Sequence, residues 1–130
     1  MSLRSKTYTI KLNPIPWQRA RLSGNRFFDA QKEDKLSFGL YLNKQHGFDP
    51  LFSNPIHMDI TFYMPIPKSI KKRKSSLYHS TFPDLDNLCK FLMDAIKDVL
   101  VIDDKIICSL SAKKMYDKEP RTEIVITEVS

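Results

Sequence analysis

Hydrophobic and polar residues alternate along several short stretches of the chain, which is the period expected of β-strands. Residues 56–64 place every second side chain on one apolar face, so they predict a half-buried strand. Residues 7–12, 105–114 and 122–127 carry the β-branched and aromatic side chains that favour strands. Because only a short turn around Pro120 separates the last two stretches, we expect them to pair as a hairpin.

Two other stretches repeat their hydrophobic residues at helical spacing. Residues 29–43 predict a helix with Leu36 and Leu40 on its apolar side and with Phe38 and Tyr41 as further candidates. The stretch that begins at residue 85 has the clearer pattern and predicts a helix to about residue 98, with a core stripe of Leu85, Leu88, Leu92, Ala95 and Ile96 that continues to Val99. The order β-α-β-α-β-β predicts a single α+β domain over residues 1–130, with helices packed on a small mixed sheet.

Composition narrows the class of partner. The formal net charge of +6 and the pI of about 9.3 favour a polyanionic partner such as nucleic acid.

Cys89 and Cys108 form no C-x-x-C pair and predict buried thiols in a reducing cytoplasm. No apolar run approaches the roughly 18 residues that span a membrane, and no signal peptide is visible, so a cytoplasmic protein without membrane contact is expected.

The residues that suit chemistry gather around the start of the second predicted helix. Residues 83–88 read Pro-Asp-Leu-Asp-Asn-Leu, a lysine follows one helical turn later, and an acid pair comes after the helix. The candidate catalytic residues are Asp84, Asp86, Asp104 and Lys90, with Asp103 as a further candidate metal ligand.

Each of these residues also has an ordinary structural explanation. Asp84 stands where a helix N-cap is expected, and Asp86 is favoured by the helix dipole. Aspartates after a helix are typical of turns. Lys90 is spaced to form helix ion pairs with Asp86 and Asp94.

Taken together, the same residues indicate metal-dependent hydrolysis of phosphodiesters. Hard divalent cations prefer carboxylate oxygens, and such an ion lowers the pKa of bound water and neutralises charge on a phosphate. A nearby lysine adds positive charge. Without metal, at least one of the clustered acids should hold its proton more tightly. His46, His57 and His79 are scattered without zinc-ligand spacing, and no G-x-S-x-G motif is present.

Basic residues in two loops are candidates for contact with DNA phosphates. A long loop follows residues 65–67 and carries a cationic run, and a second basic loop surrounds the turn at residues 23–25. The candidate DNA-binding residues are Lys68, Lys71, Lys72, Arg73, Lys74, Arg19 and Arg21. The alternative for both loops is a solvated surface segment.

The sequence resembles the RusA family of Holliday-junction resolvases in four places. These are the motif at residues 83–88 with Lys90, the acids at 103–104, the Pro-Ile-Pro-Lys at 65–68 and the closing strand. The resemblance implies a homodimeric endonuclease that cuts four-way DNA junctions by paired nicks in recombination and repair, using Mg²⁺, with Mn²⁺ as a substitute. It places the family's catalytic acids on Asp84, Asp86 and Asp104 and its functional lysine on Lys90. It also implies a phage or prophage origin and the cytoplasm of a bacterial or phage-infected cell.

Two points remain open within this resemblance. The stretch between Lys74 and Pro83 is longer than the family pattern. A helix over residues 85–98 is about 20 Å long, so Asp104 reaches Asp84 only if the chain doubles straight back. We expect one chain to gather the acids, with Asp104 of a partner subunit as the alternative. The competing functions are a non-catalytic basic nucleic-acid-binding module, and a metal-dependent nuclease acting on flaps, forks or RNA.

Overall fold

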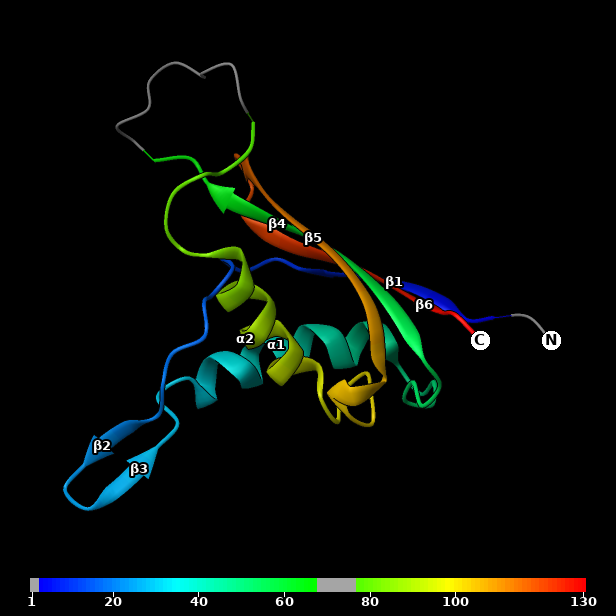
Figure 1. The fold of residues 1–130 in the computed structure, drawn as a ribbon, viewed down its shortest axis with the longest axis horizontal. Helices are drawn as coiled ribbons and strands as arrows, with labels where there is room; N and C mark the ends of the chain where they lie inside the picture. Colours follow the sequence, from blue (N-terminus) through cyan, green and yellow to red (C-terminus); the bar gives the residue numbers. More distant parts are fainter. Residues whose placement is uncertain (1–2, 68–76) are drawn as a thin grey trace.

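The computed structural model describes residues 3–67 and 77–130 and folds them as an α+β unit (Figure 1). In chain order the elements are β1 (Ser5–Ile10), β2 (Arg21–Ser23), β3 (Arg26–Phe28), α1 (Lys32–His46), β4 (Ile56–Pro65), α2 (Leu85–Ile96), the 3-10 turn η1 (Asp104–Ile106), β5 (Ile107–Asp117) and β6 (Arg121–Glu128). The predicted mixed sheet with two helices is confirmed. The strands β2 and β3 and the turn η1 are elements that the predicted order did not contain.

The main sheet has the order β1-β6-β4-β5, with β4 parallel to β5 and antiparallel to β6. The predicted hairpin between β5 and β6 is therefore wrong, because β4 lies between them. The connection over residues 118–120 spans two strand spacings of about 4.8 Å each, which three extended residues can cover. The central position gives the apolar side of β4 neighbours on both edges, such as Ala112 and Ile124 beside Ile60.

Both helices lie on the same face of the sheet (Figure 1). The α1 helix packs against α2 through Phe38, whose ring meets Phe91 edge to face at 5.1 Å between centroids. The prediction that Leu36 and Leu40 form the buried side is wrong, because these side chains are 60% and 72% exposed. Residues two apart on a helix lie about 200° apart, so burying Phe38 turns both leucines outward.

The second helix agrees with its predicted core pattern. Leu88, Leu92, Ala95 and Ile96 are buried, and Phe91 and Cys89 join them. The helix ends at Ile96, two residues before the predicted end, because Lys97 leaves the helical conformation. The predicted core position Val99 therefore lies beyond the helix and is only partly buried. The turn that follows is fixed by backbone bonds from Val99 and Leu100 to the carbonyl of Ile96.

The stretch predicted as a basic loop forms instead a two-stranded hairpin, β2–β3, that projects from the body of the molecule (Figure 1). Gly24 has a φ of 63° in its turn, a conformation that glycine adopts without strain. Phe27 near the tip is 76% exposed. Gln31 ties the base of the hairpin to α1, accepting from the Gln18 amide and donating to the Pro16 carbonyl.

Two expectations from composition can be compared with the structure. Cys89 is buried as predicted, whereas Cys108 is exposed, because it lies on β5 at the edge of the sheet. Within residues 3–67 and 77–130, no helix is both long and apolar enough to cross a membrane.

Candidate active site

Asp84 stands at the N-cap of α2 with a carboxylate that is not used for capping. The helix begins there through the backbone, since the Leu88 amide donates to the Asp84 carbonyl at 3.2 Å. Within the described part of the chain the exposed Asp84 side chain forms no hydrogen bond or ion pair. An N-cap aspartate normally accepts a hydrogen bond from the first helical turn. The capping explanation therefore does not account for this side chain, and its oxygens are available to a ligand.

Asp86 lies two residues further, in the first turn of α2. One of its carboxylate oxygens, Oδ1, accepts from the Asn87 amide at 2.9 Å. Its side chain is exposed and lines a groove beside the helix. Asp84 and Asp86 thus both lie at the start of α2. The Asp84 carboxylate has no hydrogen-bond partner among the described residues, and the Asp86 carboxylate accepts only from the neighbouring Asn87 amide.

Lys90 does not form the helix ion pairs that its spacing permits. Its ammonium lies 3.6 Å from the centre of the Trp17 ring, a cation–π contact. Trp17 is held there because its amide donates to the Asn87 carbonyl at 2.9 Å. Trp17 could not be predicted as a partner from the sequence, because it lies 73 positions from Lys90 in the chain and only the fold brings the two together.

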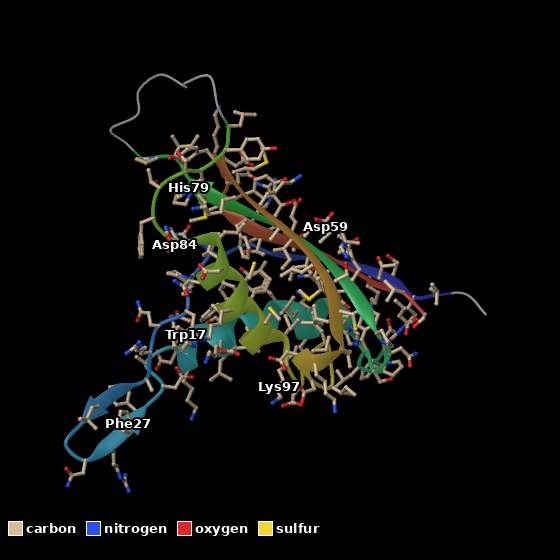
Figure 2. All side chains as sticks on the ribbon, viewed as in Figure 1. Trp17, Phe27, Asp59, His79, Asp84 and Lys97 are labelled. Atoms are coloured by element: carbon tan, nitrogen blue, oxygen red, sulfur yellow. The ribbon has the colours of Figure 1, made fainter. Side chains whose placement is uncertain are left out.

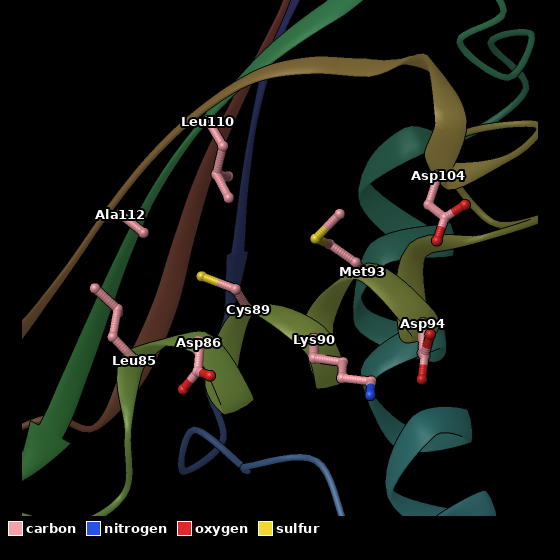
Figure 3. Close-up of a pocket in the computed structure, with 9 residues that line it drawn as sticks. All are labelled: Leu85, Asp86, Cys89, Lys90, Met93, Asp94, Asp104, Leu110 and Ala112. Atoms are coloured by element: carbon pink, nitrogen blue, oxygen red, sulfur yellow. The ribbon is translucent and has the colours of Figure 1, made fainter.

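A groove of about 670 Å³ runs between α2 and β5 (Figure 3). Leu85, Cys89, Met93, Leu110 and Ala112 supply its apolar lining. Four charged side chains complete the lining: Asp86, Lys90, Asp94 and Asp104. Figure 3 shows Asp86 near the beginning of α2, and Asp94 and Asp104 together further along the helix.

Asp103 and Asp104 share a hydrogen bond between their carboxyl groups, which changes both pKa values in opposite directions. The bond lowers the pKa of Asp103, helped by the Lys105 amide, and raises the pKa of Asp104, helped by desolvation and by the negative charge of Asp103. Asp94 adds a smaller repulsion that also raises the pKa of Asp104. Asp104 therefore holds its proton more tightly, but the acids that raise its pKa are Asp103 and Asp94 rather than the expected partners Asp84 and Asp86.

The described residues contain no group of three or more histidine, cysteine, aspartate or glutamate side chains placed to hold a metal ion. The expected single-chain cluster of Asp84, Asp86 and Asp104 is therefore not formed. The reason is the tight turn after Ile96, which leaves Asp104 beside Asp94 towards the C-terminal end of α2. The chain does double back along the helix, but β5, which follows Asp104, is the segment that reaches the start of α2.

The predicted DNA-binding residues are only partly described. Lys68, Lys71, Lys72, Arg73 and Lys74 lie outside the described residues. Arg19 is exposed just before the hairpin, and Arg21 is the first residue of β2. Their contacts with DNA remain predictions.

A second lysine near the site was not predicted. Lys114 of β5 donates from Nζ to the carbonyls of Thr81 and Pro83, immediately before Asp84. A signal for it exists in the sequence, because Lys114 continues the row of alternate residues that begins with Leu110 and Ala112. A lysine at the end of an inward-facing row is unusual enough to need a partner.

The fold and the groove define a small α+β protein that exposes carboxylates beside a lysine, the side chains suited to divalent-cation chemistry on phosphate esters. Residues 12–127 match the model of the endodeoxyribonuclease RusA family. The chain is 33% identical over 106 residues to the crossover junction endodeoxyribonuclease rusA of Lactococcus phage r1t, which covers 80% of this chain and 79% of the phage protein. It is 36% identical over 94 residues to the uncharacterized protein YqaN of Bacillus subtilis strain 168, covering 66% of each chain. The chain therefore belongs to the RusA endodeoxyribonuclease family, as the motif at residues 83–88 predicted.

Proposed function

We propose that this protein is a Mg²⁺-dependent endonuclease that resolves four-way DNA junctions by paired nicks, acting as a homodimer in recombination and repair. The observation that carries the proposal is the Asp84 carboxylate, which is exposed at the start of α2 and has no structural partner among the described residues. Family membership and the junction-cleaving name of the phage relative support the same activity.

The residues at the start of α2 fit a magnesium ion by their chemistry. Mg²⁺ is usually held by one or two carboxylates together with waters and substrate phosphates. Asp84 and Asp86 offer such oxygens, and neither forms an ion pair within the described part of the chain. When bound, the ion would supply a more acidic water and charge neutralisation at the phosphate, and Mn²⁺ is expected to substitute for it.

Lys90 has the role of a fixed positive charge near the scissile phosphate. Its exposed ammonium is held over Trp17 on the side of α2 that carries the acids of the groove. A charge that is already oriented needs little reorganisation as negative charge builds on the phosphate. The Trp17 ring thus keeps Lys90 from pairing with Asp86 or Asp94, which would neutralise it.

The separation of Asp104 from Asp84 favours a site shared between two subunits. Because one chain does not gather the acids, we propose that Asp104 of the partner subunit completes the metal site. A two-fold dimer contains two identical sites, and a four-way junction presents two nearly equivalent strands to be cut.

Selection of the substrate is expected to come from shape and charge. Contacts with phosphates position a protein on DNA without reading base sequence. The net charge of +6 and the basic residues 68–74 suit such contacts. Branched geometry, rather than base identity, would then decide where the two sites meet their strands.

Cleavage of a labelled four-way junction in Mg²⁺ tests the proposal. Asp84→Asn should reduce cleavage at least about 100-fold, because it removes a metal ligand and leaves the backbone unchanged. Junction binding in Ca²⁺ should be retained. Asp59→Asn is the matched control, since Asp59 is an exposed acid on β4, bonded to Ser111 and outside the groove (Figure 2).

Three results would decide between the functions. Paired nicks by the wild type and by Asp59→Asn, but not by Asp84→Asn, would support the resolvase. Tight binding without cleavage in Mg²⁺ or Mn²⁺ would indicate a non-catalytic binding module. Faster cleavage of flaps, forks or RNA than of the junction would reassign the substrate.

A further inference from the structure

The segment that leads into Asp84 is anchored along the end of β5. The Tyr116 amide donates to the Leu77 carbonyl at 2.8 Å, and the His79 amide donates to the Lys114 carbonyl at 3.1 Å. The rings of His79 and Tyr116 also pack together, 4.8 Å apart at their centres. Residues 77–79 therefore follow β5 in the antiparallel direction, covering this part of its free edge.

Lys114 extends this attachment through its side chain. Its Nζ donates to the Thr81 carbonyl at 2.8 Å and to the Pro83 carbonyl at 2.6 Å. Pro83 is buried and directly precedes Asp84. Hydrogen bonds with a charged donor are stronger than neutral ones, and two bonds to carbonyls two residues apart fix the path of the backbone between them.

The surroundings of Lys114 indicate that this attachment is its structural task. It pairs in register with the buried Phe62 of β4 and lies on the side of β5 that faces the helices, in line with Ala112. A partly buried ammonium is costly unless it is satisfied. Among the described residues Lys114 forms no ion pair, and its Nζ is satisfied by the two carbonyls alone.

We propose that Lys114 is a positioning residue that clamps residues 81–83 and thereby sets the orientation of Asp84 at the metal site. The inference rests on the proposed nuclease function. Lys114 acts through the backbone and touches neither metal nor DNA. Loss of the clamp lets the start of α2 and its carboxylate adopt several orientations, of which only one suits the metal and the phosphate.

The experiment compares Lys114→Met with Lys113→Met in the full-length chain. Lys113 is the matched control because it is exposed, lies next to Lys114, and points to the opposite side of β5. Both changes remove one positive charge, so electrostatic loss of DNA affinity is the same for the two. Single-turnover cleavage of a saturating four-way junction is measured across Mg²⁺ concentrations, beside junction affinity in Ca²⁺.

Lys114→Met should slow cleavage about 10- to 100-fold at saturating junction and raise the Mg²⁺ concentration needed for half the maximal rate. Lys113→Met should cleave within about twofold of the wild type. Lys114→Arg keeps the charge and the donors, so it should cleave faster than Lys114→Met. Hydrogen exchange of the amides of residues 79–88 should be faster in Lys114→Met than in Lys113→Met.

Several results would overturn the clamp. Equal rates for the two methionine variants would do so, as would a loss confined to junction affinity, which would make Lys114 a DNA contact. A wild-type chain that cleaves no branched DNA would overturn the nuclease function, whereas a cleaving wild type with an equally fast Lys114→Met variant would overturn the clamp alone. Lys114→Gln, which keeps a polar group but not the charge or the reach, replaces the methionine variant if that variant does not fold, with the same expectations.

Discussion

At the scale of single residues, the structure decides between two explanations of Asp84 and of Lys90 that the sequence left open. The N-cap explanation of Asp84 and the ion-pair explanation of Lys90 were both reasonable from spacing. The first is not supported because the carboxylate makes no capping bond, and the second because the ammonium rests on Trp17. Both side chains are consequently available for the chemistry that the motif predicted.

His79 carries a pH-dependent prediction. Burial, and then the nearby charge of Lys114, lowers the pKa of His79 below its ordinary value of 6.5. The Nδ1 atom has no hydrogen-bond partner among the described residues. The unfolded chain therefore takes up this proton more readily than the folded chain, and stability is lost as pH falls through about 6.5.

Chemical denaturation of the wild type and of His79→Gln, which does not titrate, measures this effect. Between about pH 7.5 and pH 5.5 the free energy of unfolding should fall further for the wild type than for the variant. Parallel curves over that range would show that His79 has the same proton affinity in the folded and unfolded chain.

At the scale of elements, periodicity identified α2 better than α1. In α2 the apolar residues cover one side of the helix, so only one orientation buries them. In α1 two sets compete, since Phe38 and Leu42 have the same four-residue spacing as Leu36 and Leu40. The contact of Phe38 with Phe91 selects the first set, and that contact depends on a helix about 50 residues away.

Replacing one buried and one exposed phenylalanine by alanine tests whether the helices, but not the projecting hairpin, contribute to the packed core. Phe38→Ala should cost about 3–5 kcal/mol of stability, because its side chain is 1% exposed and leaves a cavity. Phe27→Ala should cost less than about 0.5 kcal/mol, because the side chain is 76% exposed on β3.

Urea unfolding of the two variants beside the wild type provides the measurement. A similar loss of unfolding free energy at both positions would mean that Phe27 is buried in solution, with the hairpin packed against a second molecule.

At the scale of the whole molecule, the sheet order decides where the acids lie. Strand β5 leaves η1 and returns beside α2, so the groove joins the start of the helix to Asp104 at its other end. The sequence predicted that Asp84, Asp86 and Asp104 lie in one cluster, whereas the described residues contain no such group. The proposed dimer, in which each subunit contributes acids to both sites, would account for this separation.

Mixing Asp84→Asn subunits with Asp104→Asn subunits tests the shared site. If the partner supplies Asp104, each mixed dimer contains one site with both substitutions and one intact site. Cleavage should then return to about a quarter of the wild-type level after random exchange, as nicks in one strand.

A mixture of wild-type and Asp84→Asn subunits serves as the control for subunit exchange. If exchange is demonstrated and the mixture of the two inactive variants stays inactive, each site takes all its acids from one chain.

The sequence by itself determined the local features of this protein: the alternation of its strands, the amphipathic side of α2, the acids and lysine of the motif at residues 84–90, and the family. These depend on residues a few positions apart, where periodicity and side-chain chemistry are sufficient. Only the tertiary structure decided that β4 separates β5 from β6, that Trp17 lies beneath Lys90, and that Lys114 holds the residues before Asp84. Each of these depends on contacts between residues 31 or more positions apart, which form because the apolar faces of the sheet and helices can be buried together in this one arrangement.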